Sequence, residues 1–185
     1  MTHSIDHPTT DNSLLLIVDV QGKLARLMHE SEAMIHQQQI LIEACRILEL
    51  PVLWAEQLPD KLGSTVPELA EKLDGLKPKA KSSFGCWGDD NLRQTISASG
   101  RDRIILCGIE THVCVWQTAA ALQREGYHVH LIADAVSSRS AFNRKIGLQR
   151  MATAGVHLSN VEMVLFELMV DATHPCFRDV TRLLK

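Results

Sequence analysis

The chain has 185 residues, a mass of 20.6 kDa, a net charge of −3 and a pI near 6.3. This length suits a single domain, and 45% apolar with 22% charged residues excludes a disordered or fibrous protein. Without a basic excess, and with only 4% aromatic residues, no nucleic-acid partner is expected. No apolar run approaches the roughly 18–20 residues that span a bilayer. We therefore expect no membrane partner and a cytoplasmic location.

The elements predicted along the chain alternate between strands and helices. Residues 1–12 are polar and are predicted to form a flexible arm, followed by one domain over residues 13–185. Short continuous apolar runs predict strands at Leu14–Asp19, Val52–Ala55, Leu76–Lys79, Arg103–Cys107, His128–Ala133 and Val156–Leu158. Helical spacing and capping residues predict helices at Glu32–Leu48, after Thr65, at Asp89–Ala98, Thr111–Glu125 and Ala141–Ala154, after Ser159 and after Pro175.

This alternation defines the fold class. Strands separated by helices of 10–15 residues indicate βαβ units and a parallel sheet, and continuous apolar strands indicate that helices cover both faces. We predict an α/β protein, a three-layer α/β/α sandwich with a central, mostly parallel, doubly wound sheet. Ligands of such folds bind at the carboxyl ends of the strands. That rule selects Asp19, Glu56, Lys79 and the turn from Gly108 to Cys114.

Two residues stand out at these strand ends. Asp19 ends an apolar run, where a carboxylate is costly unless it is solvated or paired. It is either a catalytic group or a helix cap or salt-bridge partner. Cys114 follows a strand in the first turn of a predicted helix with Thr111 as its N-cap, a position that can depress a thiol pKa. The alternative for Cys114 is a small core residue. His112 is too close in sequence to pair with it on a helix.

A cation is available in the basic segment before Phe84. Lys79 and Lys81 lie near the end of a possible strand, where a lysine can stabilise a thiolate or hold a carboxylate. The alternative is a solvated basic loop, and spacing alone does not choose between the two lysines.

Several familiar motifs are missing from the sequence. It contains no G-x-G-x-x-G, P-loop, G-x-S-x-G or H-E-x-x-H pattern, so no nucleotide cofactor and no catalytic metal are predicted. The five cysteines are an odd number without a C-x-x-C pair, which indicates reduced thiols rather than a disulfide framework.

Together, these motifs resemble the isochorismatase-like cysteine hydrolases. The resemblance covers about residues 13–185 and is carried by Val18-Asp19-Val20-Gln21, by a lysine four residues before Ser83, and by Gly108-Ile109-Glu110-Thr111-His112-Val113-Cys114-Val115. Three further segments are similar to the short, isochorismatase domain-containing subgroup: Glu56-Gln57-x-Pro59, Ser137-Ser138-Arg139-Ser140 and Asp171-Ala172-x-His174-Pro175.

The resemblance implies a catalytic triad of Asp19, Lys79 and Cys114, with Lys79 preferred to Lys81 for its spacing to Ser83. It also implies a cis peptide bond between Ile109 and Glu110, and an oxyanion hole formed by the backbone amides of Glu110 and Cys114. The family commonly forms homo-oligomers, so self-association is expected.

Departures from the family narrow the chemistry. True isochorismatases cleave a vinyl ether and lack the nucleophilic cysteine, so Cys114 argues against that reaction. Nicotinamidases carry an Asp-x-His metal site near the pocket, and residues 55–59 of this chain, at the same place, contain no such motif.

The side chains predicted to line a substrate pocket are Gln21, Glu56, Phe84 and Trp87. Trp54 and Trp116 are further wall candidates, with the core as the alternative for each.

The resulting functional prediction is a metal-free cysteine hydrolase that cleaves a small amide or related C–N bond through a thioester on Cys114. One alternative is a catalytically silent family member that binds a small molecule or serves in assembly. Another is a redox sensor that pairs Cys114 with Cys86.

Overall fold

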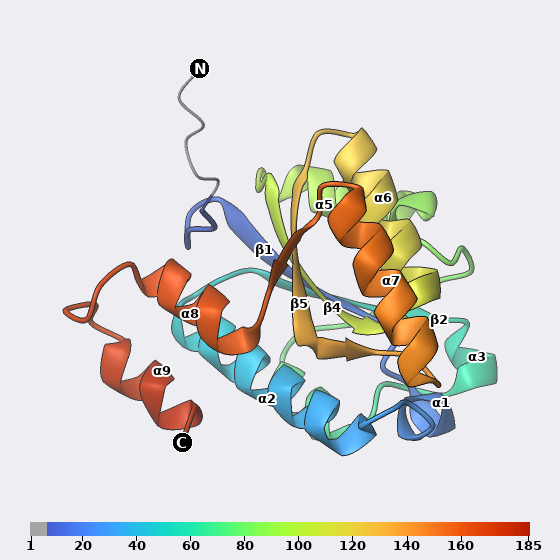
Figure 1. Cartoon of the computed structure of the whole chain (residues 1–185), viewed down its shortest axis with the longest axis horizontal. Helices are drawn as coiled ribbons and strands as arrows, with labels where there is room; N and C mark the ends of the chain where they lie inside the picture. The colour runs from blue at the N-terminus through green and yellow to red at the C-terminus, as the bar shows by residue number, and fades with distance from the viewer. Residues whose placement is uncertain (1–6) are drawn as a thin grey trace.

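The computed structural model describes residues 7–185 (Figure 1). Within them, six strands form one sheet in the order β3-β2-β1-β4-β5-β6, and every neighbouring pair is parallel. The predicted α/β architecture is thereby confirmed. The strands are β1 (Ser13–Val18), β2 (Val52–Gln57), β3 (Lys79–Lys81), β4 (Arg103–Ile109), β5 (His128–Ser137) and β6 (His157–Ser159).

Helices cover both faces of the sheet. In Figure 1, α2 lies across one face together with α8 and α9, and α5, α6 and α7 lie on the other. The α-helices are α1 (Gly22–Arg26), α2 (Ser31–Ile47), α3 (Pro59–Leu62), α4 (Pro67–Ala70), α5 (Asp90–Ala98), α6 (Trp116–Arg124), α7 (Ala141–Thr153), α8 (Val161–Met169) and α9 (Phe177–Leu183). Short 3₁₀ turns η1 (Glu71–Leu73) and η2 (Cys86–Gly88) and a π-helical turn η3 (Thr111–Val115) complete the elements.

The central strands explain why this sequence folds into three layers. All six residues of β1 are buried, and so are six of the seven residues of β4. A strand buried on both faces gains from apolar side chains at every position, which is why these segments show no alternation. The core therefore lies on both sides of β1 and β4.

The sheet reverses its winding direction between β1 and β4. The chain runs outward from β1 through β2 to β3, returns to β4 beside β1, and then runs outward the other way through β5 to β6. Such a switch point leaves a crevice at the carboxyl ends of the two central strands. Asp19 follows β1 at this place, and the turn leading to Cys114 follows β4.

Gly108 allows β1 and β4 to approach closely at the switch point. Its φ is +120°, and a Cβ at this position would meet the Val18 carbonyl oxygen at 2.1 Å and the Val18 nitrogen at 2.6 Å. The register between β4 and β5 also shifts between Leu106 and Gly108. No other residue type fits here without moving the strand that carries Asp19.

Two predicted boundaries near the site were wrong. The strand expected at Leu76–Lys79 forms at Lys79–Lys81 instead, because Pro78 has no backbone N–H for the ladder with β2. The helix expected from Thr111 begins as the π-helical turn η3, and only from Trp116 onward is it α-helical.

The caps of two helices also differ from the prediction. The Thr65 hydroxyl does not cap α4 but donates to Glu56 Oε1 at 2.7 Å. Asn160, not Ser159, caps α8, with its Oδ1 accepting from the Met163 amide at 2.8 Å.

The predicted arm is only partly within the described residues. Residues 1–6, including His3, lie outside them. The following segment is tied to the domain through the Arg103 amide, which donates to the Asn12 carbonyl at 3.0 Å, and through a hydrogen bond from Arg101 to the Thr10 carbonyl. From residue 7 onward, no helix is long and apolar enough to cross a membrane.

We predict that Gly108→Ala lowers the free energy of unfolding by about 2–4 kcal/mol, because the added methyl overlaps the Val18 backbone and the φ is unfavourable. Gly100→Ala is the matched control, since Gly100 also has a positive φ of +66° but nothing lies within 4 Å of the added Cβ. Its expected cost is about 1 kcal/mol. Equal urea-unfolding midpoints for the two variants would contradict the close approach.

Candidate active site

Asp19 is buried at the carboxyl end of β1. It is 2% exposed, and its φ of +56° places it in the left-handed region that Asp tolerates better than most residues. Its amide donates to the Ala55 carbonyl at 3.1 Å, which fixes it against β2. Burial raises the pKa of the carboxyl group, and the neighbouring Lys81 ammonium offsets part of that increase.

The partner of Asp19 is Lys81. The Lys81 Nζ donates to Asp19 Oδ2 at 2.6 Å, and its side chain is 0% exposed. Three more acceptors surround the same ammonium: Gln57 Oε1 at 2.7 Å, the Phe84 carbonyl at 3.0 Å and the Ser83 carbonyl at 3.1 Å. An ammonium has three protons, so four acceptors satisfy it completely. Lys81 is therefore fixed in position and held away from solvent.

The structure does not bring Lys79, the lysine that the resemblance preferred, to Asp19. Its Nζ donates to Asn91 Oδ1 at 3.3 Å, on the side of α5, and not to Asp19. Lys79 pairs in register with Ala55, whereas Lys81 pairs with Gln57 at the end of β2. Two residues of strand correspond to roughly 6.6 Å, which places Lys79 behind the carboxyl edge. The strand-end rule had selected Lys79 because the strand was expected to end there, and the resemblance preferred it for its spacing to Ser83.

Gln57, which the sequence analysis did not select, holds the lysine from the end of β2. Its side chain accepts from Lys81 and donates to the Ser82 carbonyl at 2.7 Å. Its backbone is clamped by Gln21, whose Oε1 accepts from the Gln57 amide at 2.6 Å and whose Nε2 donates to the Gln57 carbonyl at 3.1 Å. The predicted strand stopped at Ala55, two residues short, so Gln57 was not recognised as a strand-end residue.

Two of the predicted pocket residues serve internal hydrogen bonds. Gln21 is fully buried and also donates to the Gly63 carbonyl at 2.6 Å. Glu56 is buried, and its Oε1 accepts from both the amide and the hydroxyl of Thr65, each at 2.7 Å. Both side chains attach the loop after α3 to the carboxyl ends of β1 and β2.

Cys114 lies in the π-helical turn η3, beside the Asp19 carboxylate. The i→i−5 bond of this turn runs from the Val115 amide to the Glu110 carbonyl at 3.3 Å. Cys114 is 8% exposed, and its thiol is close enough to hydrogen bond with Asp19. Asp19 Oδ1 is buried without a well-aligned donor among the described residues, so it is open to accept a proton.

The expected depression of the thiol pKa is not found. Burial raises the pKa of Cys114 to about 12; the Asp19 charge adds to this increase, and Lys81 opposes it. The predicted N-cap does not form either, since the Thr111 hydroxyl is buried without a partner within residues 7–185. The free site thus holds a neutral thiol.

The turn before Cys114 is held by the loop after β5. The Ile109–Glu110 peptide bond is cis, at the position that the resemblance implied. Glu110 is buried, and its Oε2 accepts from the Arg139 amide at 3.0 Å and from Arg139 Nε at 3.2 Å. His112 Nδ1 lies 3.0 Å from Ser138 Oγ, so it faces this loop.

Cys86 lies close behind the nucleophile candidate. The Cys86 amide donates to Thr118 Oγ1 at 2.9 Å, and the same hydroxyl donates to the Cys114 carbonyl at 2.7 Å. Cys86 is completely buried, and burial raises its pKa to about 12. Thr118 therefore links the two turns that carry the thiols, a role that the sequence did not reveal.

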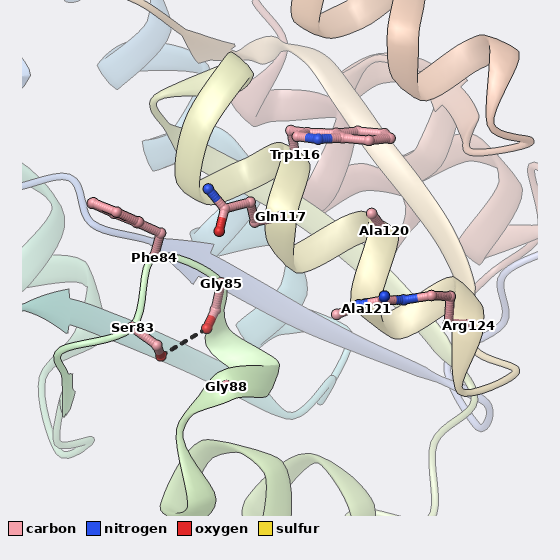
Figure 2. A pocket seen from close by; sticks show the side chains of 9 residues that line it. All are labelled: Ser83, Phe84, Gly85, Gly88, Trp116, Gln117, Ala120, Ala121 and Arg124. Carbon is pink, nitrogen blue, oxygen red and sulfur yellow. Dashed lines mark hydrogen bonds between the residues drawn. The ribbon is translucent and has the colours of Figure 1, made fainter.

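Two aromatic pocket candidates differ in their surroundings. Phe84 is 56% exposed and lines a groove next to the site together with Trp116 (Figure 2). Trp87 is half-buried and packs edge-on against Tyr127, with ring centroids 5.3 Å apart. Trp54, the other wall candidate, is buried in the core.

No group of three or more His, Cys, Asp or Glu side chains within residues 7–185 is placed to hold a metal ion. The site consists of a buried carboxylate, a buried ammonium and a thiol, at the switch point of a doubly wound sheet. That combination defines a cysteine-centred site on an α/β scaffold.

Comparison with known proteins shows the family of this chain. The model of the isochorismatase domain matches residues 13–163. Isochorismatase domain-containing protein 2 of Danio rerio is 40% identical over 176 residues, which cover 95% of this chain and 88% of that protein. The chain belongs to the isochorismatase-like hydrolase family.

Solved structures agree with this fold. The MAR1 ribonuclease of Caenorhabditis elegans superposes with a TM-score of 0.91 at 36% identity, covering 97% of this chain and 92% of the other. The YcaC gene product of Escherichia coli, an octameric hydrolase of unknown specificity, superposes with a TM-score of 0.88 at 23% identity, covering 99% and 97%. At that identity the second likeness concerns the fold alone.

We predict that Asp19→Asn moves the pH profile of Cys114 alkylation to lower pH by at least about one unit. The carboxylate raises the thiol pKa, so removing its charge leaves Lys81 to stabilise the thiolate. Rates at Cys114 are read by mass spectrometry against the other four thiols. Asp90→Asn removes an exposed carboxylate that pairs with Arg93 and serves as the control without a shift. An upward shift in Asp19→Asn would contradict the electrostatic arrangement.

Proposed function

We propose that this protein is a metal-free cysteine hydrolase that cleaves a small amide or related C–N bond through a thioester on Cys114. The observation that carries the proposal is the buried ion pair of Asp19 and Lys81 directly beside the Cys114 thiol. A carboxylate, an ammonium and a thiol in contact supply a base, a charge that stabilises the base, and a nucleophile. The triad is therefore Asp19, Lys81 and Cys114.

Asp19 acts as the proton carrier of the reaction. It takes the thiol proton as Cys114 sulfur forms a bond to the carbonyl carbon, and it returns that proton to the nitrogen when the C–N bond breaks. The amine leaves and a thioester remains. Asp19 then takes a proton from water, the hydroxide attacks the thioester, and the Cys114 thiolate leaves and regains the proton. The raised pKa of Asp19 suits a group that must hold a proton between steps.

The backbone before the nucleophile supplies donors for the oxyanion. The cis peptide at Glu110 orients the amide that follows Ile109, and no backbone carbonyl among the described residues accepts from it. Together with the Cys114 amide it forms the proposed oxyanion hole. A donor of this kind contributes about 3–4 kcal/mol to transition-state stabilisation where it has been measured.

Lys81 acts through Asp19 and does not bind the substrate. Its ammonium already has four oxygen acceptors and no exposed surface. A positioning and electrostatic role follows, in which Lys81 keeps the carboxylate ionised and correctly oriented.

RNA is a less suitable substrate for this chain, although a 36% identical relative is a ribonuclease. The net charge of −3 offers no excess of cations for phosphates. Single-stranded RNA serves as a control substrate: cleavage that is lost in Cys114→Ala would replace the amide class with RNA.

We further propose a homo-oligomer and a cytoplasmic location. An octameric neighbour of the same fold supports self-association. Sedimentation of the full chain tests the first proposal, and a single monomeric species would contradict it.

We predict that Cys114→Ala and Lys81→Met each lower turnover of a hydrolysed amide by at least about 10³-fold, because residues of a triad act as a unit. Lys79→Met is the matched control and retains at least half of the activity, since Lys79 contacts Asn91 and not the triad. A panel of small amides is screened by ammonia or amine release. Loss of activity in Lys79→Met with retention in Lys81→Met would reverse the assignment.

We also predict that Asp19→Asn abolishes turnover while it accelerates alkylation of Cys114 at neutral pH. The alkylation rate rises while turnover falls, because the substitution favours the thiolate but removes the group that carries the proton. A variant that gains both reactivity and turnover would exclude Asp19 as the proton carrier.

A further inference from the structure

A groove runs along α6 next to the proposed triad. It has a volume of about 380 Å³, and its lining includes Phe84, Gly85, Trp116, Gln117, Ala121 and Arg124. We call it the α6 groove. In Figure 2, the 83–88 loop forms one wall and α6 the other. The volume lies within the range of small-ligand sites.

The α6 groove lies beside the turn that carries the nucleophile candidate. Trp116 and Gln117 of its lining follow Cys114 by two and three residues. The opposite wall is fixed by the triad itself, because the carbonyls of Ser83 and Phe84 accept hydrogen bonds from Lys81. Both walls of the groove are thus connected directly to the segments that carry the triad.

The shape and the aromatic lining of the groove suit a flat apolar group. Small residues lie on both walls, Gly85 on the loop and Ala121 on α6, together with the aromatic side chains of Phe84 and Trp116. A Cβ on Gly85 would approach the Gln117 backbone at 3.1 Å, so the loop and α6 pack closely at this point. Phe84 leaves 56% of its surface exposed here, which an aryl group could cover.

The positive charge at the Arg124 end of the groove favours an anionic group on the bound molecule at that end. Arg124 is exposed, and no acidic side chain among the described residues pairs with it. A second cation lies close by, since the Arg150 guanidinium sits 4.7 Å from the Trp116 ring centroid. Unpaired guanidinium groups favour a carboxylate or a similar anion.

We propose that the α6 groove is a substrate subsite for an aryl group that ends in an anion, so that the substrate class is an aryl-bearing amide with a distal carboxylate. The inference rests on the proposed function for the position of the amide at Cys114. The α-helical wall, from Trp116 to Arg124, spans roughly 12 Å, and the arginine side chain shortens the distance that a ligand must bridge. A single ring between the amide and the anion fills it.

Calorimetric titration of the Cys114→Ser chain, in which the nucleophile is replaced, tests the subsite. The probes are 4-(acetamidomethyl)benzoate, N-benzylacetamide, which lacks the anion, and N-acetyl-β-alanine, which lacks the ring. We expect the first to bind at least about tenfold more tightly than either of the others. When Arg124→Ala is combined with Cys114→Ser, we expect the benzoate probe to bind no more tightly than N-benzylacetamide. When Trp116→Ala is combined with Cys114→Ser, we expect weaker binding of both aryl probes. Arg178→Ala removes an exposed arginine of α9 and leaves all three affinities unchanged.

Equal affinities for the three probes, or an Arg124→Ala variant that keeps the carboxylate advantage, would overturn the subsite. A change in the sedimentation coefficient on Arg124→Ala would also overturn it, because a second copy of the chain would then occupy the groove. Turnover of the same benzoate amide by the unsubstituted protein is measured separately. Tighter binding of the benzoate probe without turnover supports the subsite and contradicts the proposed hydrolase. Turnover with equal affinities for the three probes supports the hydrolase and contradicts the subsite.

Discussion

The buried ion pair between Asp19 and Lys81 is the interaction on which the site depends. Removing two charges from water costs several kcal/mol per ion, roughly, unless each gains a full set of partners. Lys81 gains four oxygen acceptors, contributed by the side chains of Asp19 and Gln57 and by two loop carbonyls. The ammonium thereby joins the ends of β1 and β2 to the loop that follows β3. Loss of either charge would leave the other one buried and uncompensated.

The topology explains why these groups meet. A doubly wound parallel sheet brings the carboxyl ends of its two central strands to one crevice, although Asp19 and Cys114 are far apart in the sequence. Gly108 permits the close contact of β4 with β1, and the cis bond and the π-helical turn then direct Cys114 toward Asp19. Asp19 itself has a φ of +56°, which holds its side chain at the carboxyl end of β1.

Much of the fold followed from the sequence because continuous apolar strands and amphipathic helices leave an unambiguous pattern. Asp19 was found because a charge at the end of an apolar run is costly, and Cys114 because it follows the partner strand. The lysine could not be chosen in the same way. Lys79 and Lys81 lie on the same side of one strand, so only the true end of β3, set by pairing with Gln57, distinguishes them. The π-helical turn also escaped prediction, because its i→i−5 bond depends on tertiary contacts with the loop after β5 and not on residue type.

The electrostatics of the site suggest when its chemistry starts. Burial raises the pKa of both Asp19 and Cys114, and the single ammonium of Lys81 balances only one negative charge. The raised thiol pKa therefore favours a proton on sulfur in the free protein. In the proposed mechanism, attack on a carbonyl moves the negative charge from the sulfur–carboxylate pair to the oxyanion, which backbone amides would stabilise. The thiol proton passes to Asp19, whose pKa burial raises. On this proposal, bound substrate, rather than a thiolate present beforehand, completes the nucleophile.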